Sequence, residues 1–137
     1  MNIFKTNEDP RIAAQEHCDK HVVKMCVEYA QLLSTAHRMI DGEMYYSLSK
    51  NNRRIRRYKH PNKRLDENLM KACHFNHPSN VWARETKGNY IWLYKLFTNL
   101  CDEYIYRYEK IHLCDVKLRN ILEIPPKNIN DTMVITV

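Results

Sequence analysis

Apolar residues recur at steps of three and four along two long stretches of the chain, as they do in helices that bury one face. The clearer stretch covers residues 20–40 and ends at Asp41-Gly42. Its apolar positions are Val22, Met25, Cys26, Tyr29, Leu32, Leu33, Ala36 and Ile40. The second stretch covers residues 80–112, with a bend expected at Gly88 and a stripe of Tyr90, Leu93, Phe97, Leu100, Tyr104 and Tyr108. We expect two long helices whose apolar stripes pack together as the core.

Shorter elements are predicted on either side of these helices. Asp9 at an N-cap and Pro10 at the first helical position predict a helix over residues 10–18. Further short helices are predicted over residues 67–73, capped by Asp66, and over residues 115–123, ended by two prolines. Residues 43–76 form the least regular region, and we interpret its part at about residues 43–66 as a basic irregular insertion. The β-branched tail, residues 132–137, is expected either to pair with residues 2–4 as a minor two-stranded β element or to be disordered.

Length and composition fit this helical pattern. The chain has 137 residues, which is the length of one domain, and is 44% apolar and 28% charged. It has only two glycines, which argues against a turn-rich all-β fold and excludes a Gly-rich phosphate loop. The sequence therefore predicts a mainly α, single compact helical domain over residues 1–137.

The positive charge is concentrated in one segment, residues 50–64. This segment holds eight of the 22 Lys and Arg residues and none of the 16 Asp and Glu residues. The remainder therefore carries 14 basic and 16 acidic residues, a net charge of −2. A formal charge of +6 describes a local patch on a slightly acidic body, and such a patch attracts polyanions.

No apolar run is long enough to span a bilayer, and residues 1–10 do not have the pattern of a secretory signal. The five cysteines are an odd number without a CxxC pair, which favours reduced thiols over a disulfide framework. We therefore expect no membrane partner and a cytoplasmic protein.

The first candidate site is the polar face of the helix predicted over residues 20–40. It carries His21, Lys24, Glu28, Gln31, Thr35 and Arg38 at steps of three and four. A solvated face held by pairs such as Lys24–Glu28 is the alternative. The mixture of functional groups favours a catalytic or binding site, since an imidazole transfers protons near neutral pH and cations bind phosphate.

The second candidate is a stripe on the helix predicted over residues 80–112, in which polar residues alternate with two tryptophans. If it faces the first stripe across a cleft, Glu85 would lie opposite His21, which would suit general acid–base catalysis. We therefore propose His21, Lys24, Glu28 and Glu85 as catalytic. The proposed substrate-binding residues are Asp19, Lys20, Gln31, His37, His77, Trp82, Arg84, Asn89, Trp92 and Arg107. The alternative is that the tryptophans are core and Glu103–Arg107 is a surface pair.

Two further groups point to ligands. A divalent metal could bind the histidine cluster His17, His21, His74 and His77, although its spacing matches no zinc finger. The basic segment, with tyrosines nearby, suits phosphate contacts and base stacking, or else is a flexible solvated loop. Its proposed contacts with the nucleic-acid backbone are Arg53, Arg54, Arg56, Arg57, Lys59, Lys63 and Arg64.

Several segments resemble a family of small hypothetical proteins from bacteriophage genomes, including those of marine phages. They are HCDKHVVKM (17–25), AQLLSTAHR (30–38), HP (77–78), VWARE (81–85), NYIWL (89–93) and CDEYIYR (101–107). The resemblance covers roughly residues 1–41 and 74–112. The resemblance implies a phage protein, in the cytoplasm of the infected host cell, that takes part in phage nucleic-acid metabolism or in counter-defence. It implies no catalytic mechanism.

Three functions follow as hypotheses. The first is a small phage-type enzyme acting on DNA by base excision or base modification, with the basic segment holding the backbone. The second is a non-catalytic binder of nucleic acid or of a phosphorylated nucleotide, serving counter-defence. The third is a metal-dependent hydrolase that uses the histidine cluster.

Overall fold

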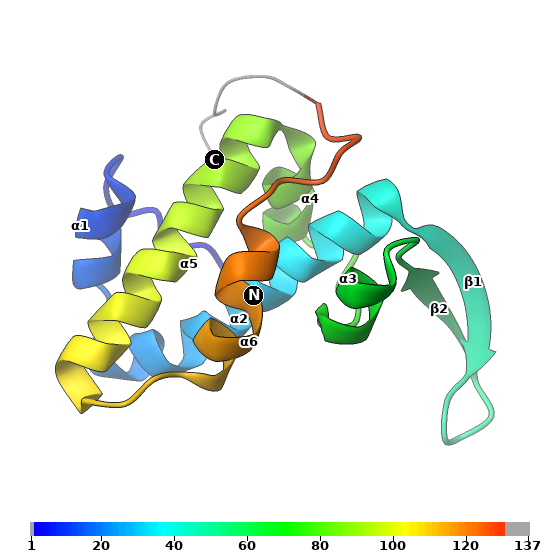
Figure 1. Cartoon of the computed structure of the whole chain (residues 1–137), viewed down its shortest axis with the longest axis horizontal. Coiled ribbons are helices and arrows are strands. Elements are labelled where there is room, and N and C mark those ends of the chain that lie inside the picture. Colours follow the sequence, from blue (N-terminus) through cyan, green and yellow to red (C-terminus); the bar gives the residue numbers. More distant parts are fainter. Residues whose placement is uncertain (1, 131–137) are drawn as a thin grey trace.

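The computed structural model describes residues 2–130 and is mainly α-helical, as the apolar periodicity predicts (Figure 1). The helices are α1 (Pro10–Gln15), α2 (Asp19–Asp41), α3 (Lys63–Asn68), α4 (Pro78–Glu85), α5 (Lys87–Tyr108) and α6 (Leu113–Leu122). Two strands, β1 (Glu43–Leu48) and β2 (Arg54–Lys59), interrupt this order after α2. None of the helices in this described part is long and apolar enough to cross a membrane.

The apolar stripe of α2 is buried as predicted, from Val22 to Ala36. Over its C-terminal half, however, burial extends around the whole helix, because Ser34, Thr35, His37 and Arg38 are also buried. Helix α2 thus runs from the surface into the interior of the domain. Its polar side chains near the C-terminal end must find partners inside the protein, since an unpaired buried polar group costs free energy.

The stretch predicted as one helix over residues 80–112 is two helices, and the break lies at Thr86 and not at Gly88. The backbone of Thr86 is extended, and its hydroxyl accepts a hydrogen bond from the Asn89 amide, which caps α5. Helix α4 begins at Pro78 with His77 as its N-cap. A threonine is a good N-cap because its oxygen satisfies an amide that the first turn leaves free.

The core forms where α1, α2, α4, α5 and α6 meet. Tyr29, Tyr90 and Phe97 are its largest fully buried side chains, with leucines of α2, α5 and α6 around them. Two hydrogen bonds attach the N-terminal segment: the Trp92 indole donates to the carbonyl of Glu8, and the Phe4 amide donates to the Tyr29 hydroxyl. This arrangement leaves the C-terminal end of α2 and the segment after α6 side by side.

The region predicted to be an irregular insertion contains an antiparallel β-hairpin, which corrects that expectation. β1 pairs with β2 in a register that places Glu43 opposite Lys59 and Leu48 opposite Arg54. Asn52 takes the left-handed conformation in the connecting turn, at a φ of 57°. The hairpin extends from the helical body at the end opposite α1, with α3 between (Figure 1).

Short helices also begin at other residues than predicted. Asn62 caps α3 in place of Asp66, and His112 caps α6. The predicted pairing of the two termini involves residues 132–137, which lie outside the described residues. Residues 2–4 adopt no strand in the part of the chain that the structure describes.

Gly42 joins α2 to β1 at a point where a larger residue would not fit. A Cβ atom there would collide with the carbonyl oxygen of Arg38 and lie 2.9 Å from that of Lys59. Its φ of −94° is open to any residue, so close approach and not backbone conformation requires glycine. The hairpin therefore leaves α2 in close contact with the strand that returns.

Candidate functional site

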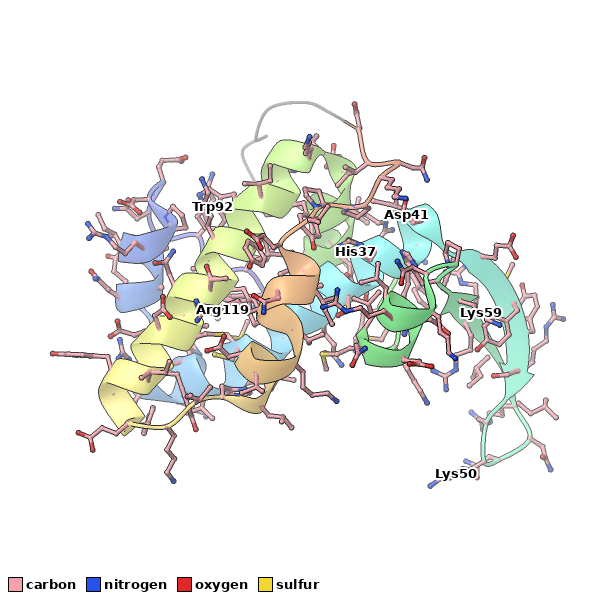
Figure 2. All side chains as sticks on the ribbon, viewed as in Figure 1. His37, Asp41, Lys50, Lys59, Trp92 and Arg119 are labelled. Carbon is pink, nitrogen blue, oxygen red and sulfur yellow. The ribbon has the colours of Figure 1, made fainter. Side chains whose placement is uncertain are left out.

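A pocket of about 520 Å³ lies at the C-terminal end of α2, between that helix, the segment that follows β2 and the segment that follows α6. Three of its lining side chains are His37, Asp41 and His60, which we call the pocket triad. Figure 2 shows His37 and Asp41 near the C-terminal end of α2. Each member offers a potential ligand atom within 4.8 Å of the other two.

His37 is held in one tautomer by a buried relay. The Tyr90 hydroxyl donates to the carbonyl of Leu122 over 2.7 Å, so it accepts from Nε2–H of His37 over 2.8 Å. Nδ1 of His37 then carries a lone pair and makes no well-aligned hydrogen bond within residues 2–130, while the ring also interacts with the backbone carbonyl of Ile124. Burial lowers the pKa of His37 to about 4, so the ring is neutral at neutral pH.

His60 and Asp41 complete the pocket triad. His60 is 6% exposed; its Nδ1 accepts from the Asn62 amide over 3.0 Å, while Nε2 is unpartnered among the described residues. Burial lowers the pKa of His60 as well. Asp41 accepts from the amides of Lys127 and Asn128 and from the Asn128 side chain, over 2.7 to 3.0 Å. The pocket therefore presents a fixed imidazole lone pair beside a second imidazole and a carboxylate.

The first polar stripe of the sequence divides between two environments. His21 stacks on Phe4 with ring centroids 4.5 Å apart, and Lys24 is exposed, while Glu28 and Gln31 are half-buried. Lys20 is exposed, and Asp19 forms an ion pair with Arg107 at 3.0 Å. No hydrogen bond or ion pair joins His21 to Glu85 in the described part of the chain, so the proposed catalytic pair lacks a direct contact.

Arg38 was grouped with the phosphate-holding residues of that stripe, and the structure places it in the interior. Its guanidinium donates to the carbonyl oxygens of Tyr58, Asp66, Leu69 and Met70 and pairs with the Asp66 carboxylate at 2.8 Å. These five acceptors use all of its donor capacity. Arg38 therefore fixes the returning chain after the hairpin and is not available to a substrate.

The second stripe is mostly structural. Trp82 and Trp92 are buried and pack edge to face at 6.1 Å, and Asn89 donates to the carbonyl of Trp82. Glu85 is exposed at the end of α4, on the far side of the break at Thr86. The alternative that the tryptophans belong to the core is the one that the structure supports.

Arg107 also serves the fold. It donates to the carbonyl oxygens of Gln15 and His17 and pairs with Glu103 and Asp19. Its position on the predicted stripe therefore reflects a link between α5, α1 and the start of α2.

The predicted histidine cluster does not come together as a metal site. His17 is buried with both ring nitrogens bonded, Nδ1 to the carbonyl of Ala13 and Nε2 to the Tyr29 hydroxyl. His77 uses its Nδ1 to accept from the Ser79 amide, and His74 is exposed. Across residues 2–130 the one group of three or more potential ligands is the pocket triad, which shares no residue with the predicted cluster.

The basic segment is ordered as the hairpin and the start of α3. Lys50 lies at the tip of the hairpin, and Lys59 ends β2 (Figure 2). Arg53, Arg54, Arg56, Arg57 and Lys59 form no ion pair with any described residue, although Lys59 lies opposite Glu43 in the register of the hairpin. The guanidinium of Arg54 lies over the Tyr46 ring at 3.6 Å, and that of Arg56 lies over Phe75 at 4.3 Å. The remaining proposed contacts, Lys63 and Arg64, are exposed on α3.

Comparison with known proteins gives no relatives: no family model, curated protein or solved structure matches the chain. The site therefore rests on geometry alone. Sequence reasoning named His37 among the substrate contacts, treated Asp41 as a helix end and did not single out His60. Asp41 and His60 could have been found from the sequence, because they lie just before and just after a segment whose two ends meet if it folds as a hairpin.

Proposed function

We propose that the protein is a small phage-type nucleic-acid enzyme that holds DNA with its β-hairpin and acts on it by base excision or base modification. The observation that carries this proposal is the charge of the hairpin. Five of its basic side chains form no ion pair among residues 2–130; Arg53, Arg54 and Lys59 are exposed, and Arg56 and Arg57 are half-buried. Phosphate contacts from such cations supply most of the affinity of nucleic-acid binding.

The shape of the hairpin supports the same partner. A two-stranded ribbon is narrow enough to enter the major groove of B-form DNA. Tyr45 and Tyr46 are about half exposed on β1, opposite Arg57 and Arg56, so aromatic rings and cations alternate across the ribbon. Aromatic rings stack on bases of any sequence, and arginines contact the neighbouring phosphates.

Arg84 of α4 and Arg56 of β2 both contact Phe75, and we propose that together they bind one phosphate of the nucleic acid. Arg84 donates through Nη2 to the carbonyl of Phe75, over 2.7 Å, and its buried Nη1 has no partner within the described residues. Arg56 lies over the ring of the same Phe75. Burial lowers the pKa of Arg84, and the neighbouring charge of Arg56 adds to this effect. An anion between the two guanidinium groups would relieve their repulsion.

The binding part of the proposal is tested by removing charge from the hairpin. The triple variant Arg53→Gln, Arg54→Gln, Arg57→Gln keeps Arg56, which packs on Phe75. We expect the slope of log affinity against log salt to become shallower by about 2.7 for duplex DNA and by about 2.1 for single strands, and the affinity to fall roughly tenfold or more. Fluorescence anisotropy with short single- and double-stranded DNA measures both.

The matched control removes three charges elsewhere, as Lys95→Gln, Lys110→Gln, Lys117→Gln. These exposed lysines belong to α5, α6 and the segment between them. Equal losses in the two triple variants would show that net charge, and not the hairpin, determines binding.

The catalytic part of the proposal is supported by the pocket triad, which offers neutral imidazoles and a carboxylate for proton transfer. Its test is nucleoside analysis by mass spectrometry of phage and host DNA after incubation with the protein. Loss or change of a base is expected. If the protein bound DNA without changing any base, the second hypothesis drawn from the sequence, a non-catalytic binder, would replace this proposal.

A further inference from the structure

We infer that the pocket triad binds a first-row transition-metal ion, with zinc as the ion that its ligands favour. Two imidazoles and one carboxylate form a ligand set that zinc accepts with three protein ligands and one open position. A tetrahedral ion about 2.1 Å from each ligand atom would hold those atoms roughly 3.4 Å apart. In the structure they lie within 4.8 Å of one another, so small side-chain rotations complete the site.

His37 is already arranged as a metal ligand. Its Nε2–H donates to Tyr90, which leaves the lone pair on Nδ1; this nitrogen makes no well-aligned hydrogen bond among residues 2–130, while the ring also interacts with the backbone carbonyl of Ile124. A ligating histidine normally donates its other N–H to a protein acceptor, which fixes the tautomer and orients the ring. The Tyr90 hydroxyl, itself anchored on the Leu122 carbonyl, fulfils that role.

His60 requires one local change. Its Nδ1 accepts from the Asn62 amide, so in the ion-free protein the proton lies on Nε2. Coordination through Nε2 moves this proton to Nδ1 and breaks the bond to Asn62. Residues 61 and 62 are exposed, so the Asn62 amide can turn to water. Binding of the ion is therefore coupled to a rearrangement of the short segment between His60 and α3.

Asp41 has room for the ion. Its carboxylate accepts three hydrogen bonds from residues 127 and 128, whereas two carboxylate oxygens offer about four acceptor sites. The three bonds orient the group, and the remaining lone pair is free for coordination. The same bonds hold the segment after α6 against the end of α2.

The open position of the ion would face the pocket, whose lining includes the cations Arg64 and Lys127. An ion with one carboxylate ligand keeps a net positive charge, so the ligand that reaches it from solvent should be a water, a hydroxide or an anion such as phosphate. Asp41 precedes β1 and His60 follows β2, so the ion would also tie together the two ends of the hairpin. This inference is independent of DNA binding by the hairpin, but it bears on the catalytic part of the proposed function, because imidazoles that coordinate an ion do not themselves accept protons. The metal titration and the nucleoside analysis therefore test the two proposals separately.

The experiment is a metal titration of the full chain after treatment with a chelator. Calorimetry with Zn²⁺ should give one ion per chain, and Co²⁺ should give the visible absorption of a tetrahedral site. His60→Gln and Asp41→Asn should each weaken binding by at least about tenfold. His74→Gln, which changes an exposed histidine, is the control and should leave the affinity within about twofold.

A second measurement uses the unaltered protein and does not depend on whether the variants fold. Zinc should shift the ring-nitrogen resonances of His37 and His60 in nuclear magnetic resonance spectra and leave those of His17 in place. Three results would overturn the inference: no stoichiometric ion in the unaltered protein, full affinity in both variants, or a cobalt–thiolate absorption band that assigns the ion to cysteines.

Discussion

The two ends of α2 carry similar polar residues and differ in what those residues contact. At the N-terminal end, His17 has both ring nitrogens bonded and Arg107 contacts three different segments. At the C-terminal end, His37 and His60 each have one buried ring nitrogen that makes no well-aligned hydrogen bond within residues 2–130, beside a pocket. A polar stripe in the sequence therefore identifies one face of a helix. Whether its side chains stabilise the fold or form a candidate site depends on how many of their polar atoms are already hydrogen-bonded within the protein.

The largest effect is expected from the two arginines that anchor these ends. Arg38 is 6% exposed and makes five polar contacts, so Arg38→Met should lower the free energy of unfolding by about 3–5 kcal/mol. The substitution removes the donor of four carbonyl groups and the charge partner of Asp66, whose carboxylate keeps, within residues 2–130, only the hydrogen bond from the His60 amide. Arg107→Met should cost roughly 1.5–3 kcal/mol, because its side chain is partly exposed to water. Urea unfolding followed by circular dichroism measures both.

Arg38→Lys sharpens this comparison, because it keeps the charge and loses the planar fork that reaches several carbonyl groups. Its stability should lie close to that of Arg38→Met. If Arg107→Met lowered the free energy of unfolding more than Arg38→Met, the N-terminal end of α2 would be the end that depends more on buried polar contacts.

A smaller effect is expected from the pH dependence of stability, which compares His37 with His17. Burial lowers the pKa of His37 from 6.5 to about 4, so the folded state stays neutral where the unfolded state binds a proton. Stability should fall as the pH drops from about 6.5 to about 4, by about 3 kcal/mol from this residue, and no further below that. Urea titrations with a chelator present, at several pH values, measure the loss.

His37→Gln should remove most of that slope, because glutamine does not titrate. His17→Gln should remove less, although burial also lowers the pKa of His17. If His37→Gln and His17→Gln reduced the pH dependence of stability equally, the two ends of α2 would respond to protons in the same way.

The helical body could be predicted from the sequence because its signal is local. The apolar stripe from Val22 to Ala36 follows the period of an α-helix, and those residues are the ones that the structure buries. The break at Thr86 could not be predicted, because the apolar pattern continues without interruption from α4 into α5. A single threonine that can cap a helix is a weaker signal than that pattern. The glycine at position 88, which looked like the bend, lies within the first turn of α5.

The hairpin and the pocket could not be predicted in the same way. Arg54, Arg56 and Arg57 stand where a strand usually has apolar residues, so neither strand shows a clear alternation. The available signals were the aromatic pair Tyr45-Tyr46 and an asparagine at the turn. Asp41 and His60 meet only once the hairpin closes, and a contact of this kind leaves no periodic trace in the sequence.

The smallest effect tests the N-terminal end directly, through His21. In the structure this imidazole stacks on Phe4, so His21→Ala should cost roughly 0.5–1.5 kcal/mol of stability. Lys24→Ala, at an exposed position of the same face, should cost less than about 0.5 kcal/mol. Because the proposed chemistry lies at the other end of α2, neither variant should change DNA binding, zinc affinity or any base-modifying activity by more than about twofold. A loss of activity in His21→Ala at nearly unchanged melting temperature would return the catalytic role to the stripe that the sequence first suggested, and would leave the pocket triad as a metal or binding site alone.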